Sequence, residues 1–186
     1  MKCFYKLPCD QLSDIQQETL NYLTTHTDLL TKNSGQLWNK VQTFEYIKHC
    51  PSLVNYCNSL NLKIKEVAFT VVWEAKDVLL HIDELPVAAK INFPIQNTHG
   101  SINSWYKIPN KIFQEYSPIS NQFNQKFYSF NGIDLTKCEL LCETELNQPM
   151  VFNSQLPHMI KMSNVTIFPR IVMPVMFFKE PLHYLK

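Results

Sequence analysis

Glycine is scarce in this sequence, where it occurs only as Gly35, Gly100 and Gly132. A phosphate-binding loop or a dinucleotide-binding fingerprint needs several glycines at short, fixed spacing, because the backbone must approach the phosphates closely. No two of the three glycines lie close together in the chain. The sequence therefore excludes the Rossmann and P-loop classes of nucleotide-binding protein.

A Cys-x-x-Cys pair is also absent, since the six cysteines lie at positions 3, 9, 50, 57, 138 and 142. Zinc ribbons depend on such pairs, so that class of metal site is not indicated. The residues after Met1 and Lys2 do not form the apolar stretch of a secretory signal, which gives no reason to expect an oxidising compartment. We therefore expect reduced and mostly buried thiols.

Long hydrophobic runs and an excess of one charge are missing as well. The longest apolar run, residues 171–178, contains Pro174 and is too short to span a bilayer, so we expect a cytoplasmic protein without a membrane partner. The net charge is +1 and the charges are scattered, which leaves no clear electrostatic footprint for nucleic acid. With 186 residues, 45% of them hydrophobic, the chain fits one globular domain.

What the sequence does contain is His81-Ile82-Asp83 inside a strand-like segment. Residues 65–73, 77–83 and 87–95 are rich in β-branched and aromatic side chains and are predicted to be consecutive strands. His81 and Asp83 are two positions apart, so on a strand both side chains point to the same face. Two further segments, 152–161 with His158 and 168–178 with Arg170, are predicted to lie beside these strands.

Two imidazoles and one carboxylate form the facial triad of non-haem Fe(II) oxygenases, which leaves three metal positions open. An arginine such as Arg170 suits the far end of a dicarboxylate, because its planar guanidinium binds a carboxylate in a bidentate way. A His-x-Asp pair also arises easily by chance, His158 could be a turn residue after Pro157, and Arg170 could face solvent at a strand edge.

Taken in order, His81-x-Asp83, His158 and then Arg170 resemble the Fe(II)- and 2-oxoglutarate-dependent oxygenases. Ile91-Asn92-Phe93-Pro94-Ile95, Trp105-Tyr106 and Leu156-Pro157-His158 are similar to motifs of the small aspartyl/prolyl-hydroxylase-like and phage-type members. The resemblance covers about residues 60–178. His158 lies 158 − 83 = 75 residues after Asp83, which is tolerable if a loop intervenes, and Arg170 lies 170 − 158 = 12 residues further on, compatible with one hairpin between adjacent strands.

The resemblance implies a double-stranded β-helix, the jelly-roll or cupin-like barrel, in a mostly β (α+β) fold. It assigns His81, Asp83 and His158 to iron, as metal ligands and catalytic centre, and Arg170 to the C5 carboxylate of 2-oxoglutarate. The co-substrates are then 2-oxoglutarate and O2. The sequence leaves a protein side chain, a free amino acid and a nucleobase open as substrates, and the resemblance favours a peptide or an amino-acid side chain. Asn92, Asn97, Trp105 and Tyr106 are further candidate contacts because they follow the metal motif in the chain, although Trp105 and Tyr106 could equally be core aromatics.

Two other functions remain open at this point. The same barrel and metal serve cupin-like enzymes that use no 2-oxoglutarate, although those usually supply more than one histidine from the first strand. A non-catalytic barrel with a vestigial metal motif is the other alternative.

Outside the motif strands, the chain is predicted to form one domain, 1–186. Residues 1–60 are expected to be mainly helical and to pack outside the barrel, with helices at 13–30 (capped by Ser13), 41–50 and 51–60 (opened by Pro51). Residues 61–186 are expected to form the β-helix core, with a long loop insert around 96–128, where Pro109 and Pro118 interrupt regular structure. A final predicted strand covers 138–145.

Overall fold

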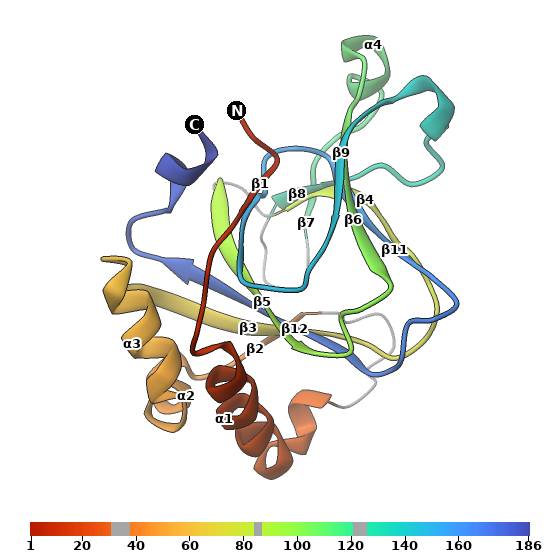
Figure 1. Ribbon diagram of the computed structural model, residues 1–186. Helices are drawn as coiled ribbons and strands as arrows, with labels where there is room; N and C mark the ends of the chain where they lie inside the picture. Colours follow the sequence, from red (N-terminus) through yellow and green to blue (C-terminus); the bar gives the residue numbers. More distant parts are fainter. Residues whose placement is uncertain (31–37, 84–86, 121–125) are drawn as a thin grey trace.

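Two antiparallel six-stranded sheets form a β-sandwich (Figure 1) in this computed structural model, which describes residues 1–30, 38–83, 87–120 and 126–186. Sheet A contains, from edge to edge, β1 (Phe4–Lys6), β10 (Met150–Asn153), β5 (Ala89–Gln96), β12 (Arg170–Phe177), β3 (Ile64–Val72) and β2 (Trp38–Lys40). Sheet B contains β7 (Ile119–Ser120), β8 (Lys126–Ser129), β4 (Val78–Ile82), β11 (His158–Met162), β6 (Ser101–Lys107) and β9 (Glu139–Glu145).

The chain alternates between the two sheets along most of its β-rich part. β3, β5, β10 and β12 belong to sheet A, whereas β4, β6, β9 and β11 belong to sheet B. In sheet A these four strands are neighbours in the order β10-β5-β12-β3, and in sheet B in the order β4-β11-β6-β9. Strands far apart in the sequence are thereby brought side by side, as β4 and β11 are.

Side chains of sheet A alternate between an outer face and the space between the sheets. Ile91 and Phe93 of β5 are fully buried in a hydrophobic core together with residues of the helices. Lys90 and Asn92 of the same strand point the other way, into the interior of the sandwich, because successive strand residues face opposite sides. The interior near sheet B contains its own apolar cluster around Trp105, Phe152 and Val172.

The helices cover the outer face of sheet A, as Figure 1 shows and as the sequence predicts. They are α1 (Leu12–Thr25), α2 (Thr43–His49) and α3 (Pro51–Ser59), and they bury Ile15, Tyr46 and Leu53 completely. Pro51 opens α3 at the start of its first turn, as expected. Ser13 does not cap α1, because the helix begins one residue earlier, with Gln11 at the N-cap position and no side-chain cap.

The strands that carry the sequence motifs are confirmed. The predicted segments 65–73, 77–83, 87–95 and 138–145 correspond to β3, β4, β5 and β9, and the segment 168–178 corresponds to β12. Residues 152–161 contain the end of β10 and most of β11. A mostly β architecture with helices packed outside one sheet is therefore present.

One prediction for the remaining segments is wrong, and another is incomplete. The segment 96–128 is more than a loop, because β6 lies within it and pairs with both β11 and β9 in the middle of sheet B. It also contains α4 (Asn110–Phe113), β7 and part of β8, while 121–125 lie outside the described residues. The mainly helical N-terminal part supplies β1 and β2, the two edge strands of sheet A.

The thiol prediction holds in part. Cys50 and Cys57 are free and fully buried, whereas Cys3 and Cys142 are joined in a disulfide that links the segment before β1 to β9. Proximity of the two cysteines depends on the packing of the chain's first residues against Trp105 and Phe152. The spacing of 139 residues gave no indication of it.

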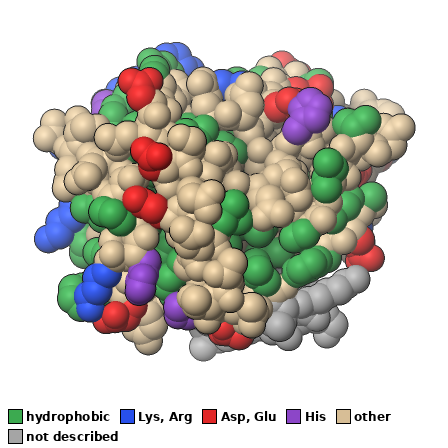
Figure 2. Space-filling view, turned by 60° about the horizontal axis from the view of Figure 1, so that its bottom comes forward, with side chains coloured by type: hydrophobic (Ala, Val, Ile, Leu, Met, Phe, Trp, Pro, Cys, Tyr) green, Lys and Arg blue, Asp and Glu red, His purple; other side chains and the backbone are tan. Residues whose placement is uncertain are grey.

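No helix in the described ranges is long and apolar enough to cross a membrane. Figure 2 views the molecule from the side on which the helices lie. On this face, described lysine and arginine side chains are scattered and do not gather into a basic patch.

Candidate metal centre

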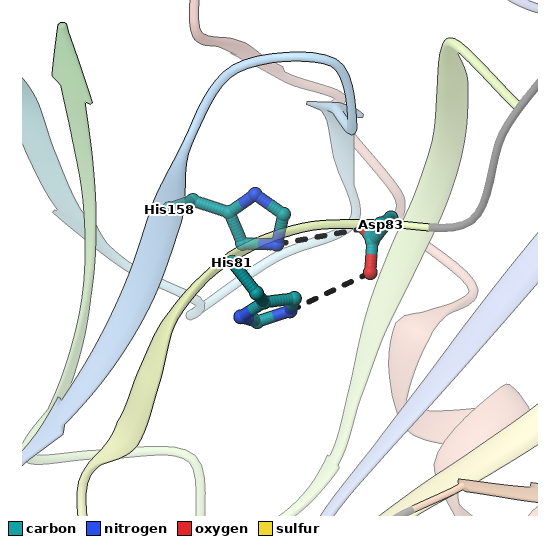
Figure 3. A group of neighbouring side chains, drawn as sticks. All are labelled: His81, Asp83 and His158. Atoms are coloured by element: carbon teal, nitrogen blue, oxygen red, sulfur yellow. Dashed lines mark ion pairs between the residues drawn. The ribbon is translucent and has the colours of Figure 1, made fainter. Parts of the chain in front are cut away.

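His81, Asp83 and His158 converge at one end of the interior (Figure 3). One nitrogen of each histidine and one oxygen of Asp83 lie within 4.8 Å of one another. His81 Nε2 is 3.5 Å from Asp83 Oδ1, and His158 Nε2 is 3.5 Å from Asp83 Oδ2. Two metal–ligand bonds of about 2.0–2.2 Å span up to about 4.4 Å, so only a small inward rotation closes the three donors on one ion.

Strand pairing brings the two histidines together. β4 and β11 are antiparallel neighbours in sheet B, and His158 is the direct register partner of His81. Asp83 follows the last residue of β4, two positions after His81, so both side chains point to the same side of the sheet. The donors therefore come from a single strand pair, although 75 residues separate Asp83 from His158 (158 − 83).

Backbone carbonyls orient both imidazole rings. Nδ1 of His81 lies 2.8 Å from the carbonyl oxygen of Leu79, and Nδ1 of His158 lies 2.8 Å from that of Leu156. A carbonyl oxygen only accepts hydrogen bonds, so Nδ1 must be the protonated nitrogen in each ring. Nε2 then presents its lone pair toward Asp83, which is the arrangement of a metal-ligating histidine with a hydrogen-bonded second nitrogen.

Asp83 is ionised because of its cationic neighbour. Lys90 Nζ donates to Asp83 Oδ2 at 2.6 Å, and the Lys90 side chain is 7% exposed. Burial by itself would raise the pKa of Asp83, but the charge of Lys90, together with His158 and His81, outweighs burial and holds that pKa well below its usual range. The carboxylate is therefore available as a ligand without first losing a proton.

His158 is buried and neutral. Burial, and then the proximity of His81, lower the pKa of His158 to about 3, against the opposing effect of Asp83. Phe152 packs edge-on against the His158 ring with centroids 4.6 Å apart, and Trp105 lies 6.5 Å away. His81 is more open, with 23% of its side chain exposed, so the centre is accessible from the His81 side.

Arg170 occupies the same interior. It is the first residue of β12 and is 1% exposed, and its Nε donates to Ser101 Oγ on β6, so the side chain crosses from sheet A to sheet B. Nη1 is buried without a hydrogen-bond partner, and no described carboxylate forms an ion pair with this arginine. Burial lowers the pKa of Arg170 to about 10, which leaves the guanidinium charged at neutral pH.

The connection from His158 to Arg170 differs from the predicted hairpin. β11 belongs to sheet B and β12 to sheet A, so the twelve-residue separation is a crossing between sheets. β12 pairs with β3 and β5 instead. Arg170 is nevertheless directed inward, because the crossing places the start of β12 opposite β6.

Of the other candidate contacts, Trp105 lies on the inner side of sheet B with His158, and Tyr106 faces away from it. Trp105 is fully buried in the interior, whereas Tyr106 belongs to a cluster with Leu80 and Ile82 on the opposite side of sheet B. Asn97 donates to the carbonyl of Pro169. Asn92 faces the interior and its buried Oδ1 has no partner.

Lys90 and Ser101 were missed by the sequence interpretation. A signal for Lys90 existed, because it is the one charged residue in the apolar stretch 87–95 and has the inward parity of Asn92. Ser101 had none, since its segment was expected to be a loop.

A cavity of about 390 Å³ flanks the segments that carry His81 and His158, on the other side of sheet B. It is lined by residues that include Ile82, Tyr106, Phe113, Tyr128 and Leu156.

No protein-family profile and no curated protein matches this sequence. Among solved structures, the chain is similar to AviO1 from Streptomyces viridochromogenes Tue57, with a TM-score of 0.51. The likeness covers 97% of this chain and 90% of AviO1, at 10% sequence identity. At that identity the similarity concerns the fold alone.

Proposed function

We propose that this protein is an Fe(II)- and 2-oxoglutarate-dependent oxygenase built on a double-stranded β-helix. The strand order supports the fold. Numbering β3, β4, β5, β6, β9, β10, β11 and β12 from one to eight, sheet A reads 6-3-8-1 and sheet B reads 2-7-4-5. The strands of a jelly roll also alternate between two sheets, and this likeness supports the proposed fold.

The observation that carries the function is the triad combined with an unsatisfied buried cation in the same interior. His81, Asp83 and His158 form a 2-His-1-carboxylate donor set suited to Fe(II). Arg170 has a buried Nη1 without a partner, and a charged donor in that state is costly unless an anion binds it. The site thus has two halves, the triad and Arg170. A small molecule that coordinates the metal at one end and carries a carboxylate at the other would bind to both.

The two halves are at different depths along β6. His158 is the register partner of Trp105, and Ser101, the partner of Arg170, lies 105 − 101 = 4 residues further along the strand. Four strand residues correspond to about 13 Å between Cα atoms, so Arg170 and the triad lie at separate levels of the interior. A dicarboxylate that meets the metal with one end can direct its other end toward Arg170.

Charge in the interior favours such a dianion. Lys90 and Arg170 contribute two positive charges and Asp83 one negative charge, so these three groups leave the lumen cationic even before a metal is bound. Iron, when bound together with 2-oxoglutarate and O2, would supply the oxidative chemistry: O2 oxidises 2-oxoglutarate to succinate and CO2 and also a C–H group of the substrate. His81, Asp83 and His158 hold the metal, Arg170 orients the C5 carboxylate, and Trp105 and Phe152 limit access of water.

The substrate is proposed to be a peptide or an amino-acid side chain. The largely apolar cavity beside Ile82 and Leu156 lies on the other side of sheet B, next to the segments that carry His81 and His158, and it is suited to hold a part of the substrate that is remote from the reacting group. Its position supports recognition of an apolar part of the substrate.

Thermal unfolding with Mn(II), in the presence and absence of 2-oxoglutarate, tests this proposal, because ligands that bind the native state raise its stability. Mn(II) should raise the melting temperature, and 2-oxoglutarate should raise it further only with Mn(II) present. Glutarate is the matched control, since it keeps both carboxylates but lacks the keto oxygen that chelates the metal. A response to Mn(II) without one to 2-oxoglutarate would favour a cupin-like enzyme, and no response to Mn(II) would favour a non-catalytic barrel.

A further inference from the structure

Lys90 lies beside the metal ligands without being one of them. Its ammonium group is 2.6 Å from Asp83 Oδ2, and its side chain is almost fully buried. The rings of Trp38 and Phe152 lie 5.1 Å and 5.6 Å from Nζ, so the charge is held between two aromatic faces. Asp83 is the single carboxylate among the described residues with which Lys90 forms an ion pair.

This contact distinguishes the two oxygens of Asp83. Each oxygen lies 3.5 Å from one histidine, Oδ1 from His81 Nε2 and Oδ2 from His158 Nε2, but only Oδ2 accepts a hydrogen bond from Lys90. A carboxylate with one oxygen held by an ammonium group has the other oxygen left for a metal. The arrangement favours ligation through Oδ1 alone, which keeps the remaining metal positions open.

Charge balance gives Lys90 a second effect. A divalent ion and the Asp83 carboxylate together carry +1, and the ammonium group beside them brings the centre to +2. Electrostatic attraction in a buried site of low effective dielectric is strong over a few ångströms. A lysine at this position therefore opposes the cation and favours an anion that completes its coordination.

We propose that Lys90 makes the metal centre selective for an anionic ligand, weakening the binding of the metal alone and strengthening the binding of a carboxylate to the metal-loaded centre. This inference rests on the metal site of the proposed function, and it is independent of Arg170 and of the identity of the diacid.

The sign of each effect follows from the pair. Removing the ammonium group removes repulsion of the metal and also leaves Asp83 without a partner in the metal-free protein, and both changes tighten metal binding. The same removal takes one positive charge away from a bound anion, which weakens carboxylate binding. A lysine that merely held Asp83 in place would give the opposite result for the metal.

The test measures two dissociation constants, for Mn(II) alone and for oxalate on the Mn(II)-loaded protein, by calorimetry. Lys90→Met removes the charge and the donor, whereas Lys90→Gln removes the charge and keeps a donor for Oδ2. In both variants Mn(II) should bind more tightly than in the wild type, and oxalate should bind about tenfold or more weakly. Lys161→Met, which removes an exposed lysine paired with Glu143, is the matched control and should leave both constants close to the wild-type values.

Weaker Mn(II) binding in both Lys90 variants, or unchanged oxalate binding, would overturn the inference and leave Lys90 as a residue that only positions Asp83. Oxalate probes the centre without Arg170, so failure of 2-oxoglutarate to bind the wild type would contradict the proposed co-substrate and not the role of Lys90. Failure of the wild type to bind Mn(II) would contradict both.

Discussion

His81 and His158 face each other as register partners on antiparallel strands, with ring centroids 4.3 Å apart. Each ring is oriented by the carbonyl oxygen of the residue two positions earlier, Leu79 or Leu156. The two histidines thus reach their positions by one local rule, applied on two neighbouring strands. The site depends on the register between β4 and β11, and a slip of one residue would turn one imidazole out of the interior.

Asp83→Asn should abolish tight Mn(II) binding. The variant keeps the shape of the side chain but loses the only negative charge of the donor set, so a loss of at least about 100-fold is expected. Calorimetric titration with Mn(II) measures it. Asp77→Asn, which changes the exposed acceptor of the Met162 amide, is the control and should bind Mn(II) as the wild type does.

Asp83→Ala should also destabilise the metal-free protein, and more strongly than Asp83→Asn does. Lys90 would remain buried without its carboxylate, and breaking one side of a buried pair costs about 3–5 kcal/mol. Urea denaturation of metal-free protein should therefore show a larger loss for Asp83→Ala than for Asp83→Asn. Equal and small losses would mean that Lys90 finds another partner.

Arg170→Ala should weaken 2-oxoglutarate binding to the Mn(II)-loaded protein by about 30-fold or more, since a buried carboxylate would lose its charged partner at a cost of about 2–5 kcal/mol. Arg170→Lys should fall between, because it keeps the charge and loses the planar fork. Mn(II) affinity should stay the same in both. An equal loss of metal and co-substrate binding would instead identify Arg170 as a structural residue.

Local sequence patterns were enough to predict the strands of the candidate metal centre and the three residues that meet there. Segments rich in β-branched, aromatic and other apolar residues predicted β3, β4, β5 and β12, and the i, i+2 spacing placed His81 and Asp83 on one face. The identity of the strand beside β4 was predictable only because a second motif, Pro157-His158, marked it. These features depend on residues that are close together in the sequence, so they can be predicted from it.

The strands β6, β1 and β2 could not be predicted in this way, because they depend on contacts between distant parts of the chain. β6 has polar residues such as Ser101 and Asn103 on its inner face, since the lumen is polar there, and this removed the apolar signal of a strand. β1 and β2 have three residues each and exist because they pair with β10 and β3. Their formation depends on packing that no local pattern encodes.

The metal-free protein should lose stability as the pH falls below about 6.5. In the unfolded chain the pKa of His158 is near 6.5, and in the folded protein it is about 3, so between these values the unfolded state binds the additional proton. The free energy of unfolding therefore decreases as the pH falls through this window. The lowered pKa of Asp83 adds a loss at still lower pH, below its ordinary value of 3.8.

Urea denaturation at pH 7, 6, 5 and 4 measures this slope. His158→Gln should have a flatter profile between pH 6.5 and pH 4, because the group that takes up the proton on unfolding is gone. His183→Gln, a change at an exposed position near the C-terminus, is the control and should retain the wild-type slope. A wild-type profile that is flat over this range would contradict a buried, neutral His158.

The thiols should fall into three classes in a labelling experiment. Cys9 and Cys138 are partly exposed and should react first with a thiol reagent. Cys50 and Cys57 are fully buried, burial raises the pKa of Cys57 to about 12, and both should react only on unfolding. Denatured protein should show four thiols without reductant and six with it, and six in both cases would contradict the link between Cys3 and Cys142.

Gly100→Ala should destabilise the protein more than Gly132→Ala does. Both glycines have positive φ, +74° and +77°, so each substitution carries a backbone cost of about 1–2 kcal/mol. Only at Gly100 would the new Cβ meet neighbours, Ser163 Oγ at 2.7 Å and Val165 Cγ2 at 2.8 Å, which adds about 1–3 kcal/mol of overpacking. At Gly132 nothing lies within 4 Å. The difference in the free energy of unfolding between the two variants, measured by urea denaturation, reports the cost of the steric contacts at position 100. Equal losses would mean that the turn before β6 shifts enough to remove these contacts.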